Sequence, residues 1–142
     1  MQFLYKKDFE SLALNDCPPS DYEAKLIESA FRWVFDDIED SRNFQSQYHK
    51  NPKRFLDKSE KIICSGLALS MFDSVENAQT RFYELKEILQ QKAYHTLGTK
   101  IAVGTLTELD GINSKTDENG HFNHHLVAET NYYKRFKIIE TL

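Results

Sequence analysis

The residues best suited to chemistry are three histidines that stand close together, His121, His124 and His125. An imidazole can act near neutral pH as a general base, a phosphate contact or a metal ligand. If these residues form a strand, His121 and His125 share a face ~13 Å apart at ~3.3 Å per residue, while His124 points the other way. No two of them can then hold one zinc ion, and the HEXXH and CxxC motifs are absent from the sequence. We therefore predict no metal site and no cofactor, and treat His121 and His125 as candidates for catalysis or binding.

Polar and apolar residues alternate through 121–129, which predicts a strand with two unlike faces. One face is polar and should meet solvent, a ligand or a partner: His121, Asn123, His125 and Glu129. The other face is mostly apolar and should pack on the core: Phe122, His124, Leu126 and Ala128. The polar face is the predicted functional surface, and it makes Glu129 a further catalytic candidate.

Ser70 is a candidate of a different kind, a hydroxyl on a short apolar segment. Carboxylates crowd the loop before the histidines, Asp110, Asp117 and Glu118, where they could do acid–base work but are also ordinary turn residues. The chain has only five glycines and lacks the G-x-G-x-x-G, P-loop and G-x-S-x-G patterns. The common nucleotide-binding folds are therefore not predicted, and no serine triad can be recognised.

The first element expected to position such residues is a long helix. Ser20 and Glu23 form a capping-box pattern, and apolar residues then recur every three or four positions, which predicts a helix over 21–40. The last turn of this helix would place three carboxylates on one side: Asp36, Asp37 and Asp40. We take these as a candidate binding patch for a basic partner or a cation.

The remaining patterns predict a short helix over 52–60, a strand over 66–72, a helix over 74–92 and strands over 99–109, 121–129 and 136–139. The expected fold is α+β, in a single domain spanning 1–142. Its first half would be helical and its second half mainly β. The N-terminal helices and one long amphipathic helix would pack on a mostly antiparallel C-terminal sheet of about four strands.

The composition of the chain limits the classes of partner and the cellular location that we expect. The 142 residues include 18 basic and 22 acidic side chains, a formal net charge of −4 that disfavours non-specific attraction to nucleic acid or to an anionic membrane. No secretory signal or membrane-spanning pattern is present, so a cytoplasmic protein is expected. Cys17 and Cys64 lie far apart in sequence, and we predict two free thiols, with Cys64 a small buried apolar residue.

The leading functional hypothesis is a small cytoplasmic binding or regulatory protein whose partner is another protein, of an immunity or accessory type. It is based on the acidic helix, the lack of catalytic motifs and the small number of glycines. The alternative hypothesis is an enzyme that uses NAD or another nucleotide at the C-terminal sheet.

This alternative follows from a resemblance. The segment Leu67–Ser74 (LALSMFDS), the helix and strands after it, and Phe136-Lys137-Ile138 near the end resemble the second half of the ADP-ribosyltransferases. That family has an S-T-S strand before a helix and a catalytic glutamate before a final F-K-V-like strand; here the S-T-S triplet and the E-x-E pair are absent. The resemblance implies that Ser70 positions a ribose and that Glu129 stabilises a developing positive charge.

Overall fold

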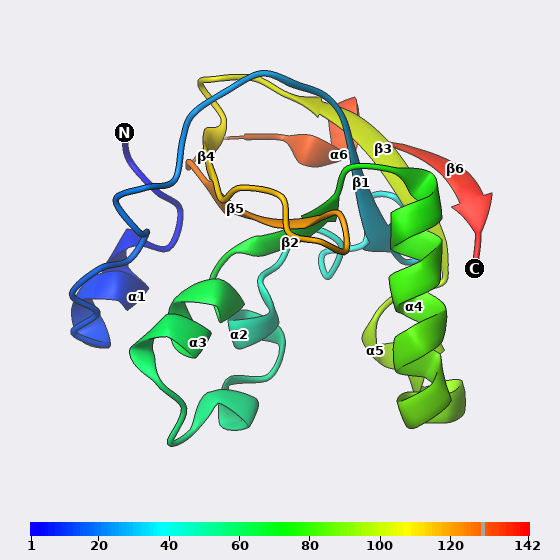
Figure 1. The fold of residues 1–142 in the computed structure, drawn as a ribbon, viewed down its shortest axis with the longest axis horizontal. Coiled ribbons are helices and arrows are strands. Elements are labelled where there is room, and N and C mark those ends of the chain that lie inside the picture. Colours follow the sequence, from blue (N-terminus) through cyan, green and yellow to red (C-terminus); the bar gives the residue numbers. More distant parts are fainter. Residues whose placement is uncertain (129) are drawn as a thin grey trace.

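Six antiparallel strands form one sheet in the computed structural model, which describes residues 1–128 and 130–142 (Figure 1). The order across the sheet is β4-β5-β2-β1-β3-β6, so strands from both halves of the chain lie side by side. The strands are β1 Ile27–Val34, β2 Leu69–Phe72, β3 Lys100–Leu106, β4 Gly111–Asn113, β5 His121–Leu126 and β6 Lys137–Thr141.

In the described part of the chain, seven short helices and one long helix, α4, pack around the sheet. They are α1 Lys6–Ser11, α2 Gln47–Lys50, η1 Pro52–Phe55, α3 Glu60–Gly66, α4 Val75–Leu89, η2 Gln90–Lys92, α5 Ala93–Thr96 and α6 Tyr132–Arg135, where η marks a 3-10 helix. In Figure 1, α1, α2 and α3 form one group and α4 with α5 forms another. Among the residues described, no helix has both the length and the apolar character needed to cross a membrane.

The two faces of the sheet pack against different elements. On one face, Phe72 and Ile101 contact Ala78 of α4, and Trp33 reaches both this cluster and the next turn of the helix. On the other face, a larger core forms around Met71, with Tyr132 and Phe136 from α6 and the turn after it. Alternation along each strand explains the division, because successive side chains point to opposite faces.

The mixed helix-and-sheet character is confirmed, but the helix predicted over 21–40 is wrong. The chain forms β1 there, in which Ala30, Arg32 and Val34 are buried on one face. Phe31 and Trp33 point to the other face, where they pack under α4. A strand that is apolar on both faces also matches a three- and four-residue spacing, and this ambiguity produced the error.

The residue ranges and the number of several other predicted helices and strands also differ from the structure. The first half is not purely helical, because it supplies β1 and β2, and the sheet has six strands rather than about four. The helix expected over 52–60 is instead η1 followed by α3, with Ser59 capping α3 through the Ile62 N–H. The strand expected over 66–72 begins at Leu69, since Gly66 ends α3. The helix over 74–92 is confirmed as α4 and η2. Strands are also found where the three C-terminal ones were expected; β3 and β5 are shorter than predicted, and β6 runs two residues further, to Thr141.

Candidate functional site

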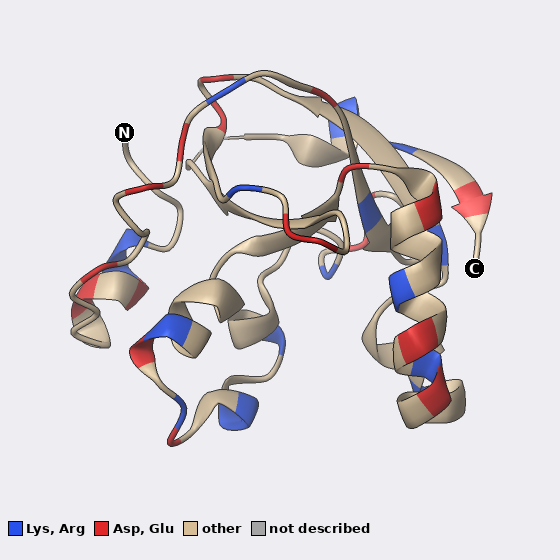
Figure 2. Cartoon of the chain, in the orientation of Figure 1, with Lys and Arg blue, Asp and Glu red and all other residues tan. Residues whose placement is uncertain are grey.

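A cleft of about 250 Å³ lies on the sheet face that carries α4. Strands β1, β2 and β5 supply its floor: Trp33, Ser70, Phe72 and His121. Helix α4 lines one side with Arg81 and Leu85, and the α2–η1 segment lines it with Gln47 and Arg54. Figure 2 shows Lys and Arg on both of these elements, with acidic residues also present on α4.

Ser70 and His121 meet on the floor of this cleft. The Ser70 Oγ lies 2.7 Å from the His121 Nε2, a hydrogen-bond distance. The pairing of β2 with β5 brings them together: Phe72 lies opposite His121 and Ser70 opposite Asn123, so Ser70 and His121 are diagonal neighbours on one face. Two candidates that are 51 residues apart in sequence therefore form one site.

A carboxylate stands on the far side of His121. The Asp117 Oδ2 lies 3.7 Å from the His121 Nδ1, which is an ion-pair distance and too long for a hydrogen bond. The Asp117 Oδ1 accepts hydrogen bonds from the backbone N–H groups of Asn119 and His121. The loop carboxylate thus has a turn role, and it also approaches the imidazole.

Burial lowers the pKa of His121 below its usual value, an effect that the nearby Asp117 charge opposes. The ring is therefore neutral at pH 7, and its Nε2 can accept the hydroxyl proton of Ser70. A serine held against a neutral histidine can position a substrate hydroxyl or pass a proton during group transfer.

A second cleft of about 420 Å³ adjoins the first, and Gln47 and Arg54 line both. Its ionisable lining residues are all of basic type: Arg42, His49, Lys50, Arg54 and His95. Two of them contact carboxylates outside the lining, Arg42 with Asp40 and His49 with Asp8. No carboxylate in the described part of the chain lines this second cleft. Burial, reinforced by the charges of Arg32 and Arg42, lowers the pKa of Lys50 to about 7. The two clefts therefore offer a continuous, mainly basic surface beside the Ser70–His121 pair.

The other end of β5 is closed, and the predicted exposure of His125 is wrong. His125 is 1 % exposed, because Phe9 of α1 and Tyr22 of the N-terminal segment pack their rings against it. Asn123, between the two histidines, is half-buried and its amide lies 3.5 Å from the Tyr22 Oη and 3.4 Å from the Ser65 Oγ. Glu129 lies outside the described residues.

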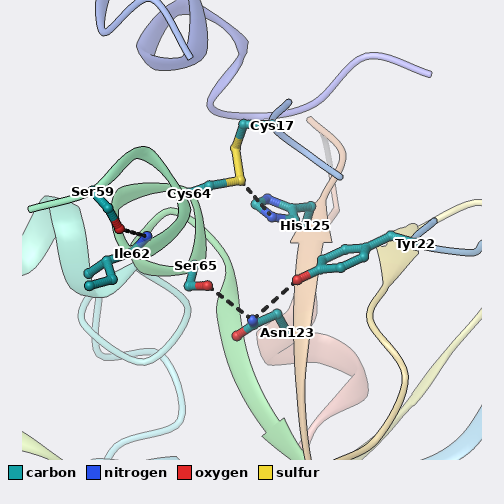
Figure 3. The surroundings of a disulfide bond; sticks show 8 residues. All are labelled: Cys17, Tyr22, Ser59, Ile62, Cys64, Ser65, Asn123 and His125. Carbon is teal, nitrogen blue, oxygen red and sulfur yellow. Dashed lines mark hydrogen bonds between the residues drawn. A yellow bond between two sulfur atoms is a disulfide. The ribbon is translucent and has the colours of Figure 1, made fainter. Parts of the chain in front are cut away.

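Cys17 and Cys64 form a disulfide beside His125, so the prediction of two free thiols is wrong (Figure 3). The Cys64 Sγ lies 3.7 Å from the His125 Nε2. A cavity of about 680 Å³ borders the disulfide. Burial lowers the pKa of His125 to about 4, and its Nδ1 is the one buried side-chain polar atom without a hydrogen-bond partner among the residues described.

His124 is the core-facing histidine that the alternation predicts. It is fully buried, with its Nδ1 2.6 Å from the Asn113 Oδ1 and its Nε2 2.5 Å from the Tyr132 Oη. A neutral ring can donate to the amide oxygen and accept from the phenol. Burial lowers the pKa of His124 to about 3, which keeps the ring in that neutral form.

The three aspartates predicted to share a helix face lie instead in the loop after β1, because no helix forms there. The Asp36 Oδ1 accepts a hydrogen bond from the Thr99 hydroxyl at 2.5 Å. The Asp37 Oδ1 accepts from the Glu39 N–H, and Asp40 pairs with the Arg42 guanidinium. This pairing lowers the pKa of Asp40 to about 2. Asp37 and Asp40 therefore accept hydrogen bonds within a turn, and Asp36 bonds to the residue before β3, so the three do not share a helix face. Their role in binding a partner stays a prediction.

The sequence interpretation missed the arginines around the cleft. Arg54 and Arg81 line it, and Arg32 lies buried beneath it with its Nη1 2.7 Å from the Ser70 carbonyl oxygen. The Arg32 Nε also donates to the Asn43 carbonyl at 2.7 Å. The available signal was a single cation inside an otherwise apolar alternation, between Phe31 and Trp33.

The cleft combines a serine–histidine pair, a nearby carboxylate, arginines and a partly exposed Trp33. Arginines bind phosphate and carboxylate groups, and an indole ring can stack on a planar ligand. Comparison of the chain with family models, with curated proteins and with solved structures found no match.

Proposed function

We propose that this protein is an enzyme that uses NAD or a related nucleotide, with its active site at Ser70 and His121. The observation that carries this proposal is the 2.7 Å contact between the Ser70 Oγ and the His121 Nε2 on the floor of an arginine-lined cleft. It is the alternative of the two hypotheses that the sequence supports.

The lining of the cleft favours a ligand that is both anionic and aromatic. Arg54 lines both clefts, and Arg81 of α4 also lines the first. Guanidinium groups make strong charge-assisted hydrogen bonds to phosphates. Trp33 supplies an aromatic surface, and the adjoining clefts together fall in the ~300–1,000 Å³ range of small-molecule sites. A nucleotide has both a phosphate and a planar base.

The serine and the histidine then have separate roles. The resemblance to the ADP-ribosyltransferases implies that Ser70 positions a ribose hydroxyl, and the Ser70 side chain faces the cleft, as this role requires. His121, neutral through burial, takes up the proton of the group that attacks the ribose. Asp117 is the one carboxylate in the described lining, and it is placed to stabilise positive charge on or near His121.

The interpretation as a binding or regulatory protein stays a prediction. One of its three grounds was an acidic helix, and β1 with its following loop stands in that place. The cytoplasmic location stays a prediction as well, and the Cys17–Cys64 disulfide is more typical of an oxidising compartment.

A ligand screen tests the proposal first. The thermal midpoint is measured with NAD, ADP-ribose, ATP, ADP and AMP, each at millimolar concentration. A ligand present at 100 times its Kd stabilises the folded state by ~2.7 kcal/mol, which raises the midpoint by several degrees. If none of these nucleotides moves the midpoint, the proposal is wrong.

Turnover is the second test. Nicotinamide release from NAD is followed by chromatography for the wild type, Ser70→Ala and His121→Ala. We expect both variants to lose at least about 100-fold in rate, in the range ~10²–10⁴ typical of lost acid–base groups. Ser29→Ala, an exposed serine on β1, is the matched control and should keep the wild-type rate. Equal rates in all four proteins would remove Ser70 and His121 from the mechanism.

A further inference from the structure

We propose that Cys17, Cys64 and His125 form a binding site for a thiophilic divalent cation, zinc, once the disulfide between the two cysteines is reduced. The site is separate from the Ser70–His121 cleft and does not depend on the proposed function. It uses residues from three elements: the N-terminal loop, α3 and β5.

The distances fit one metal ion. The two sulfur atoms and a ring nitrogen of His125 all lie within 4.8 Å of one another. The Cys64 Sγ and the His125 Nε2 are 3.7 Å apart, close to the ~3.6 Å between a thiolate and an imidazole nitrogen on one tetrahedral zinc. After reduction the sulfurs would need to separate to only ~3.8 Å, the corresponding distance between two zinc-bound thiolates.

The environment of His125 also indicates a missing partner. The ring is 1 % exposed, its Nδ1 has no hydrogen-bond partner, and its Nε2 has only the long contact to sulfur. A buried imidazole without strong partners costs free energy. Coordination through Nε2, the nitrogen that contacts the sulfur, would give that atom a strong partner in place of the long contact, and Figure 3 shows the ring directed at the disulfide. The Nδ1 would then carry the ring proton.

Three protein ligands leave one position of a tetrahedral ion open. The disulfide borders the cavity of about 680 Å³, which is large enough for a water molecule as the fourth ligand. Asp16, Asp21 and Glu60 line this cavity, opposed by Lys61 and Lys115. Three carboxylates against two ammonium groups leave the lining of the cavity slightly acidic, which favours a cation.

The chemistry balances in two steps. A dithiol supplies two electrons and its own two protons and becomes a disulfide. A phosphine supplies two electrons and becomes a phosphine oxide, and a water molecule provides the oxygen and the two protons. In both cases the Cys17–Cys64 bond breaks and two thiols form. Zinc then binds both sulfurs as thiolates, and the two thiol protons pass to solvent. Neither step needs a group other than the reductant, the ion and solvent water.

The experiment compares reduced and oxidised protein. The chain is treated with a water-soluble phosphine under nitrogen, freed of the reagent, and titrated with Zn²⁺ and, in parallel, with Co²⁺. We expect one zinc ion per chain in the reduced protein and none in the oxidised protein. The cobalt form should show the strong visible bands of a tetrahedral thiolate site.

Variants identify the ligands. Cys17→Ser, Cys64→Ser and His125→Gln should each weaken zinc binding by roughly 100-fold or more. His121→Gln is the matched control, since His121 lies on the same face of β5 but away from the sulfurs. It should bind zinc as the wild type does.

If reduction unfolds the chain, circular dichroism can still test the proposal by following whether added zinc refolds it. In that case zinc should restore the folded spectrum of the wild type and fail to restore that of His125→Gln, since binding and folding are coupled. Reduced wild type that neither binds micromolar zinc nor refolds with it would overturn the proposal. Unchanged zinc affinity in His125→Gln would overturn it too.

Discussion

The two ends of β5 carry the same residue type on the same face, and the chain surrounds them differently. At one end His121 faces a cleft between α4 and the α2–η1 segment, where it contacts a serine hydroxyl. At the other end His125 lies under the N-terminal segment, where it contacts a sulfur atom and two aromatic rings. The first end lines an open cleft, and the second is covered by the N-terminal segment, next to the cavity that borders the disulfide.

This difference shows that the strand pattern determines only which side chains share a face. The elements that cover the face determine the chemistry. The covering segment at His125 belongs to the first 22 residues, and its position depends on the bond from Cys17 to Cys64. The position of α4, which lies over the His121 end, depends on its packing against Phe72 and Trp33 of the sheet. Changes to either cover should therefore affect one end of β5 and leave the other unchanged.

The largest expected effect comes from reducing the disulfide. It spans 47 residues, for which the loop-closure model gives ~4 kcal/mol; strain and residual structure usually reduce this value, so we expect a loss of ~2–4 kcal/mol. Urea unfolding with a phosphine reductant and a metal chelator measures it.

The Cys17→Ala/Cys64→Ala double variant provides the control, because its unfolding should not respond to the reductant. If the wild type also keeps its urea midpoint after reduction, the bond does not hold the N-terminal segment in place. Any nucleotide bound at the His121 end should still bind to the reduced, folded chain.

The sequence correctly predicted the features that depend only on residues close together in the chain. The alternation through 121–129 predicted His121, Asn123 and His125 on one face and His124 in the core, and the structure has that arrangement within β5. The spacing of Val75, Ala78 and Phe82 likewise predicted α4, because a helix repeats within a few residues.

The rest depends on contacts between distant segments. Ser70 and His121 were separate candidates, and only the register of β2 against β5 shows that they touch. The sequence allowed a disulfide between Cys17 and Cys64 but favoured two free thiols, because their distance in space could not be read from it. The error over 21–40 has another origin: Phe31 and Trp33 are covered by a helix that follows much later, so both faces of β1 needed apolar residues.

A second effect separates the neighbouring histidines. His124→Ala should lower the free energy of unfolding by ~1–3 kcal/mol, because it leaves the buried Asn113 and Tyr132 groups without their partner. His125→Phe should change it by less than ~1 kcal/mol, since it removes an unsatisfied nitrogen and keeps a ring of similar shape. Both are measured by urea unfolding of the oxidised protein. An equal loss of unfolding free energy in the two variants would show that the His125 Nδ1 has a hydrogen-bond partner in solution.

A smaller effect, on the affinity for NAD, should follow from removing Arg54 at the cleft beside His121. Arg54 lines both clefts, so Arg54→Ala should raise the Kd for NAD about tenfold, which corresponds to ~1.4 kcal/mol. Isothermal titration calorimetry measures the change. Lys137→Ala removes an exposed cation on β6, at the opposite edge of the sheet from β4, and should leave the Kd unchanged. Similar increases in both variants would indicate a general charge effect and no local phosphate contact.

The smallest effect is a pH dependence that only the open end should show. Burial lowers the pKa of Lys50 to about 7, so its ammonium is charged at pH 6 and mostly neutral at pH 8. NAD carries a diphosphate that does not titrate in this range, and its affinity should therefore fall a few-fold between pH 6 and pH 8. Lys50→Met should bind NAD more weakly at pH 6 and lose most of this dependence. A wild-type affinity that is constant between pH 6 and pH 8, or a dependence that persists in Lys50→Met, would place the diphosphate outside the second cleft.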